Sequence, residues 1–133
     1  MRGPKPALRQ DAAAVADVPR APTWLTKDAK AEWRRIMPLL VERRILTDAD
    51  MGSVENYCLA IGQVRIAQRT IDADGLTTTT ATGLRAHPAV KIQSDAMTRA
   101  RLLAAELGLT PVSRSRPSIR EDQTAADDAD LGL

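Results

Sequence analysis

The hydrophobic residues between Thr47 and Asp74 recur at spacings of three, four and seven, which predicts one long amphipathic helix. Thr47 and Asp50 have the spacing of a capping-box pair at its start. At about 1.5 Å per residue the helix would reach about 40 Å. That is more than a chain of 133 residues needs to close its own core. The apolar stripe consists of Met51, Val54, Tyr57, Cys58, Ile61, Val64, Ala67 and Ile71.

The surplus length of this helix suggests that part of its stripe packs against other copies of the chain. The expected contact residues are Val54, Tyr57, Ile61, Val64 and Ile71. Packing within the chain is the alternative, because a domain buries its apolar faces in a few layers around one core. Gly52 and Gly62 each weaken a helix by about 1 kcal/mol. They indicate places where another backbone comes close.

A shorter helix is expected before the central one, with Thr26 as its N-cap and Asp28 in its first turn. Pro38 is expected to kink or shorten it, since proline removes an internal hydrogen bond. The short turn at Ile45 and Leu46 then predicts that the two helices pack as an antiparallel hairpin. The apolar stripe of this first helix consists of Ala29, Trp33, Ile36, Met37, Leu40 and Val41.

Two short strands and a third helix are expected after Gly75, a plausible helix C-cap. Leu76–Thr80 is rich in β-branched residues and predicts a strand that returns over Leu84–Ala86. His87-Pro88 opens the last helix, which ends near Gly108. The predicted fold is mainly α: a helical hairpin plus a third helix, a short β-hairpin connector and flexible termini.

The composition indicates one small domain with an aliphatic core, because the 133 residues include no Phe, one Tyr and two Trp. We expect a disordered basic N-terminal arm over residues 1–22 and a helical core and oligomerisation domain over residues 23–111. Residues 112–133 predict a flexible tail that is basic at first and acidic after Arg120.

The formal net charge is only +2, but cations cluster on the first predicted helix and just beyond it. Clustered Lys and Arg on one face are typical of contact with phosphates. A solvated surface is the simpler interpretation of any one of these residues. As a set they are the expected DNA-binding residues: Lys27, Lys30, Arg34, Arg35, Arg43 and Arg44, with Arg2, Lys5 and Arg9 from the arm.

The sequence contains no motif typical of a catalytic or metal site. A phosphate-binding loop of the G-x-x-x-x-G-K-[ST] type, an H-E-x-x-H pair and a Cys/His cluster are all missing. Cys58 is expected to be buried, and His87 to be a helix-end hydrogen-bonding group. We therefore expect no catalytic residues, no metal and no cofactor. A metal-dependent nuclease would have to use Asp48, Asp50, Asp72 and Asp74, and it is the least favoured alternative.

No apolar run reaches the length of a membrane helix and no signal peptide is visible, so we expect a soluble intracellular protein without a membrane partner.

Several short motifs, in this order and spacing, resemble the small terminase subunit of tailed bacteriophages, of the P27 family. The resemblance covers about residues 1–116. Arg44 departs from it, because the family tends to have Gly before the Leu-Thr turn. The motifs are Pro22-Thr23-Trp24-Leu25, Ala29 with Trp33, Ile36, Pro38 and Leu40, Leu46-Thr47 with Asp50, Tyr57-Cys58, Gly75, His87-Pro88-Ala89-Val90, Ala105-Glu106-Leu107-Gly108-Leu109-Thr110-Pro111, and Ser113-Arg114 with Arg116.

The resemblance implies a non-catalytic protein that recognises double-stranded viral DNA and hands it to the large terminase subunit, which carries the ATPase and nuclease. It also implies a helical homo-oligomeric ring, of about eight to ten subunits, in the cytoplasm of the host bacterium. Leu109–Leu133 is the expected contact with the large subunit. The runner-up is a helix-turn-helix phage transcriptional regulator that acts as a dimer. Its recognition helix would begin with Asp48 and Asp50, which suit a DNA groove badly.

Overall fold

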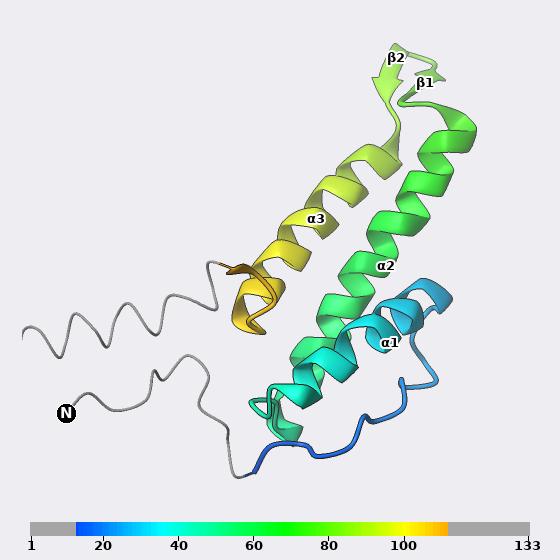
Figure 1. The fold of residues 1–133 in the computed structure, drawn as a ribbon. Coiled ribbons are helices and arrows are strands. Elements are labelled where there is room, and N and C mark those ends of the chain that lie inside the picture. The colour runs from blue at the N-terminus through cyan, green and yellow to red at the C-terminus, as the bar shows by residue number, and fades with distance from the viewer. Residues whose placement is uncertain (1–12, 112–133) are drawn as a thin grey trace, which may run out of the picture.

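The structure is a computed structural model and describes residues 13–111. In chain order it contains α1 (Lys27–Glu42), a 3-10 turn η2 (Asp48–Asp50), α2 (Met51–Asp74), β1 (Thr77–Thr80), β2 (Gly83–Ala86) and α3 (Pro88–Glu106). The predicted mainly helical fold with a β-hairpin connector is confirmed. Figure 1 shows α2 and α3 as long neighbours, with α1 crossing α2 and the β-hairpin at the far end.

Helix α1 begins at the predicted cap, where the Thr26 hydroxyl accepts a hydrogen bond of 3.2 Å from the backbone N–H of Ala29. Its predicted apolar stripe is buried in full. Pro38 lies inside the helix on its exposed side, and the helix continues to Glu42. Of the two expected effects of Pro38, shortening of the helix was therefore wrong, and a kink stays a prediction. The rest of the last turn still forms, and it is held by the buried side chains of Leu40 and Val41.

Helix α2 is the long central helix that the periodicity predicts, preceded by one 3-10 turn. The capping box is present: the backbone N–H of Thr47 donates to the Asp50 carboxylate at 2.9 Å. Gly75 ends the helix with φ of 84°, a conformation that favours glycine. Its N–H donates to the carbonyl of Ile71 at 2.7 Å.

Gly62 allows α1 to lie close against α2. A Cβ at this position would stand 3.1 Å from both the backbone nitrogen of Ala29 and the hydroxyl of Thr26. The close backbone approach expected at Gly62 is confirmed, and the neighbour is α1 of the same chain. Within the chain, Gly52 has no atom within 4 Å of such a Cβ, so a close approach there stays a prediction for a contact with another copy. The start of α1 is thus fixed on the middle of α2.

Helix α3 packs along α2 through small residues, because Ala89, Ala96 and Ala100 are its buried side chains. At its start, His87 accepts a hydrogen bond from the N–H of Ala89 through Nδ1, as expected of a helix-end group. Met97 lies on the same helix and is exposed. The stretch from α1 to α3 forms one main core, joined by a small second cluster of Ala67, Ile71 and Ala89.

Part of the expected N-terminal arm contacts the helices. Residues 13–22 belong to the described chain, and the N–H of Val15 donates to the carbonyl of Leu46 at 2.8 Å. The indole N–H of Trp33 donates to the carbonyl of Pro19 at 2.9 Å. This segment thus packs beside α1, whereas residues 1–12 and the tail over residues 112–133 lie outside the described residues.

Candidate nucleic-acid interface

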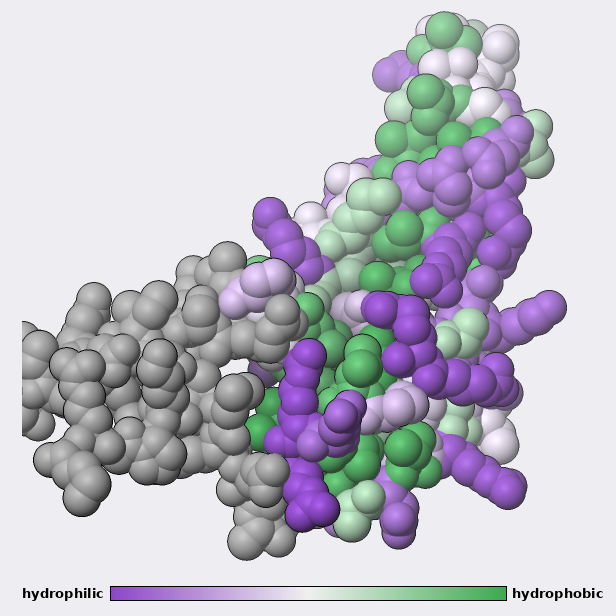
Figure 2. Space-filling model, in the orientation of Figure 1, coloured by the Kyte–Doolittle hydropathy of each residue, from purple (hydrophilic) through white to green (hydrophobic). Residues whose placement is uncertain are grey.

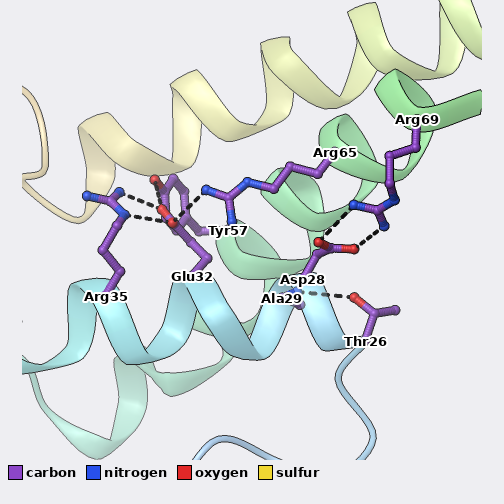
Figure 3. Close-up of polar contacts among 8 residues, drawn as sticks. All are labelled: Thr26, Asp28, Ala29, Glu32, Arg35, Tyr57, Arg65 and Arg69. Carbon is purple, nitrogen blue, oxygen red and sulfur yellow. Dashed lines mark hydrogen bonds and ion pairs between the residues drawn. The ribbon is translucent and has the colours of Figure 1, made fainter. Parts of the chain in front are cut away.

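Two acidic residues of α1 face α2 and form ion pairs there (Figure 3). Asp28 accepts two hydrogen bonds from the guanidinium of Arg69, one of them 3.1 Å long. Glu32 lies four residues on, at the next turn of the same helix face. Its ion-pair partner on α2, Arg65, approaches it to 3.5 Å. Both acids of the first half of α1 therefore neutralise arginines of α2.

Glu32 is the one buried charged residue in the described chain, with 1% of its surface exposed. Arg35 donates two hydrogen bonds to its carboxylate, at 2.7 and 2.6 Å, and the Tyr57 hydroxyl donates a third at 2.7 Å. Burial acts to raise the pKa of Glu32, but the hydrogen bonds from Arg35 and Tyr57 and the nearby cations outweigh it and hold that pKa below its usual value. Glu32 is thus ionised and fully paired at neutral pH.

The remaining cations of α1 have no such partner. The side chains of Lys27, Lys30 and Arg34 form no hydrogen bond or ion pair with any residue between 13 and 111. Lys27 and Arg34 are exposed, and Lys30 is half-buried. Because Asp28 and Glu32 are bound to arginines of α2, the outer side of the first half of α1 carries a net positive charge.

Arg20 joins these cations from the segment that precedes α1. A shallow pocket of about 450 Å³ is lined by three basic side chains, those of Arg20, Lys30 and Arg34. No acidic residue lines it, and the ring of Trp33 forms part of its wall. Sequence reasoning missed Arg20, because it lies in the segment taken for a disordered arm. The residue before it, Pro19, holds this segment beside α1, because the Pro19 carbonyl accepts a hydrogen bond from the indole of Trp33.

The other predicted DNA-binding residues have different surroundings. Arg35 is engaged by Glu32, and this hydrogen-bonded ion pair raises the pKa of its guanidinium although partial burial acts to lower it. Arg43 donates to the carbonyl of Gly108 at 2.7 Å and so joins the end of α1 to the end of α3. Arg44 is exposed in the turn after α1, with φ of 54°. Arg2, Lys5 and Arg9 lie outside the described residues.

The five residues expected at subunit contacts fall into two groups. Val54, Tyr57 and Ile71 are buried within the chain. Ile61 and Val64 are half-buried and line an open groove between α2 and α3, together with Met97 and Ala104. The three residues of the first group therefore stabilise the fold of the single chain. Only the second group is open to a contact with another copy.

Two further open pockets, which share Gln63, lie between the same two helices and are together called the second groove. Leu59 and Leu102 line one of them, and Ile66 and Ile92 line the other. At about 100° per residue, Leu59 and Ile66 project from roughly the opposite side of α2 to Val64. The helix pair therefore carries an apolar groove on each side. In Figure 2 hydrophobic residues also reach the surface where α2 and α3 meet and at the hairpin.

Three of the four aspartates considered for a metal site, Asp50, Asp72 and Asp74, have structural partners. Asp50 caps the start of α2 by accepting from Thr47, and Asp74 lies 2.9 Å from Nε2 of His87. Asp72 accepts from Gln68 at 2.8 Å. Within residues 13–111 no group of three or more potential metal ligands comes together, and none of the helices there is long and apolar enough to cross a membrane. Cys58 is buried as expected, and burial raises the pKa of its thiol to about 12.

Comparison with known proteins gives one family. The family model described as phage terminase, small subunit, matches residues 29–124, which include most of α1 and all of α2, the β-hairpin and α3. No curated protein and no solved structure gives a match.

Proposed function

Because the chain belongs to the family of phage terminase small subunits, we propose that it is the non-catalytic DNA-recognition component of a phage packaging motor, of the P27 type. In this role it binds double-stranded viral DNA in the host cytoplasm and delivers it to the large subunit, the ATPase and nuclease. The segment Leu109–Leu133 is the proposed contact with the large subunit. Its described part follows directly on α3.

The observation that carries the DNA-binding proposal is the separation of charge on α1. Asp28 and Glu32 are bound to arginines of α2, which leaves an outer face of unopposed cations. That face consists of Lys27, Lys30 and Arg34, extended by Arg20. Such a face attracts the DNA backbone by releasing counterions, which gives affinity without base readout.

Reversal of two of these charges tests the face. The double variant Lys30→Glu/Arg34→Glu should weaken binding to duplex DNA and lower the slope of log K against log salt by about 2 or more. Fluorescence anisotropy at several salt concentrations measures both quantities. Neither side chain has a partner in the described chain, so the fold should be retained, and circular dichroism checks this.

Lys91→Glu is the matched control, since Lys91 is an exposed cation on α3 that lines neither of the grooves between α2 and α3. It should change DNA affinity much less than the double variant. If the control loses as much DNA affinity as the double variant, the net charge of the protein governs binding and the α1 face does not. Unchanged binding by the double variant at low salt would contradict the proposed face.

We further propose that the protein assembles as a ring of about eight to ten copies. Two apolar grooves on opposite sides of α2 and α3 support this, because a head-to-tail contact needs two different surfaces on each subunit. Neither groove is covered by a described part of the same chain.

A further inference from the structure

The β-hairpin is the least supported element of the fold. It projects beyond the ends of α2 and α3, and hydrophobic residues reach the surface there (Figures 1 and 2). Apart from the half-buried Thr78, all of its strand residues are exposed, with Leu84 at 69%. An isolated two-stranded hairpin is marginal in water. Because the hairpin is short and exposed, we expect a further contact to stabilise it.

The strand register identifies which backbone groups point outward. Thr78 pairs with Arg85 and Thr80 with Gly83, while the N–H of His87 donates to the carbonyl of Leu76 at 2.8 Å. In an antiparallel ladder, hydrogen-bonded and non-hydrogen-bonded pairs alternate. The pairs between these bonded ones therefore turn their N–H and C=O groups away from the partner strand. These pairs are Thr77 with Ala86 and Thr79 with Leu84.

Both outer edges are open. No described residue outside the hairpin hydrogen-bonds to the backbone of Thr77 or Thr79 on β1, or of Leu84 or Ala86 on β2. Proteins usually protect such edges with charges, proline or bulges. Here β1 consists of four threonines, and Arg85 is the only charged residue of either strand. The edges therefore have the character of strands that pair with another strand.

We propose that the β2 edge of one copy pairs with the β1 edge of the next copy, so that the hairpins of an assembly form one continuous antiparallel sheet. This inference rests on the proposed function, because it requires the chain to assemble. Each chain supplies both kinds of edge. When copies are related by rotation about one axis, every β2 meets the following β1 in the antiparallel direction. The two apolar grooves along α2 and α3 likewise give each copy two different surfaces for a head-to-tail contact.

A proline at Thr79 tests the edge selectively. Thr79→Pro removes an outward N–H and leaves the bonds between β1 and β2 in place. Thr79→Val is the matched control, since it keeps the N–H and a β-branched side chain. Thr79→Pro should raise the concentration at the midpoint of assembly about tenfold or more, because each junction loses a hydrogen bond. Thr79→Val should assemble as the natural chain does.

Native mass spectrometry over a dilution series gives the midpoint, and thermal unfolding followed by circular dichroism shows whether each variant folds. If the natural chain assembles and Thr79→Pro is folded with an unchanged midpoint, the hairpin proposal is wrong and the assembly stands. If the natural chain stays monomeric at all concentrations, with and without DNA, the proposed ring fails together with the hairpin junction.

Disulfide cross-linking tests the direction of pairing and does not depend on the proline variant. Thr79→Cys and Leu84→Cys chains are co-expressed and oxidised, with the natural chain, whose Cys58 is buried, as the control. A linked dimer should form in the mixture and in neither single variant. A linked dimer within one single variant would show pairing of like edges and overturn the proposal. No linkage in any assembled sample would overturn it as well.

Discussion

Glu32 is the residue on which the junction of α1 and α2 depends. A buried carboxylate is costly unless all of its lone pairs are used. Here Arg35, Tyr57 and Arg65 surround it, and no buried polar side-chain atom of the described chain lacks a partner. Arg35 and Tyr57 come from different helices, so the same carboxylate orients α1 on α2. The orientation of α1 at this junction also determines which way the cations on its outer side face.

Glu32→Gln should therefore destabilise the fold by about 2–4 kcal/mol at neutral pH, because the arginines lose their countercharge. It should also reduce the loss of unfolding free energy as the pH falls. The pKa of Glu32 is lower in the folded chain than its ordinary value of 4.5. Its ionised form thus contributes fully above about pH 4.5, and this contribution is lost as the pH falls through the folded-state value. Urea unfolding from pH 3 to pH 7, a range of about four units around that value, measures both effects.

Glu42→Gln is the control for this experiment, since Glu42 is an exposed glutamate of the same helix. It should leave stability within about 0.5 kcal/mol of the natural chain. If Glu32→Gln shows the same dependence of unfolding free energy on acid pH as the natural chain, other carboxylates govern acid unfolding.

At the scale of elements, the turn from α1 to α2 contains a backbone conformation that its residue does not favour. Arg44 has φ of 54°, in the left-handed region. An L-residue with a Cβ pays about 1–2 kcal/mol there relative to right-handed backbone, and glycine does not. The sequence resemblance had placed Gly at this position in the family. A glycine at this position would adopt the same conformation without that cost.

Arg44→Gly should stabilise the protein by about 0.5–1 kcal/mol, after the larger entropy loss of glycine on folding is included. The urea midpoint should rise with an unchanged m-value. Arg44→Ala is the matched control, because alanine also lacks the charge but keeps the Cβ. The free energy of unfolding of this alanine variant should rise little above that of the natural chain. Equal stability of the Gly and Ala variants would show that the backbone conformation costs nothing here.

At the scale of the whole molecule, a flat three-helix arrangement leaves both sides of the α2–α3 pair apolar. Ile66, Ile92 and Leu102 on one side and Met97 on the other are each well exposed in the single chain. Exposed patches of this kind on a small protein mark surfaces for other molecules. A second copy is the proposed occupant of both sides.

Leu102→Asp should therefore disrupt assembly while leaving the monomer folded, because Leu102 is already exposed in one chain and an unpaired charge is excluded from an apolar contact. Light scattering gives the solution mass, and thermal unfolding gives the stability. Ser94→Asp adds the same charge at an exposed polar position of α3 and should keep the natural mass. A Leu102→Asp variant of natural mass would exclude this groove, and a natural chain that is a stable dimer would favour the helix-turn-helix regulator instead.

The sequence by itself determined the elements and their order, because these depend on contacts within a few residues. The hydrophobic period defined α1 and α2, and local hydrogen bonds at Thr26, Thr47 with Asp50 and His87 defined where helices start. Gly75 and Pro88 separated the helices from the hairpin. Where a local rule was applied too strictly, as at Pro38, packing of the neighbouring side chains prevailed.

Only the tertiary structure decided which charged and apolar residues remain available to a partner. Arg34 and Arg35 are neighbours in the sequence, yet one is free and the other is bound to Glu32. Asp28 finds its partner 41 residues away, at Arg69. Such pairings depend on how α1 crosses α2, which the close contact at Gly62 fixes. No pattern along the chain contains that crossing, because it arises from the packing of surfaces that are distant in sequence.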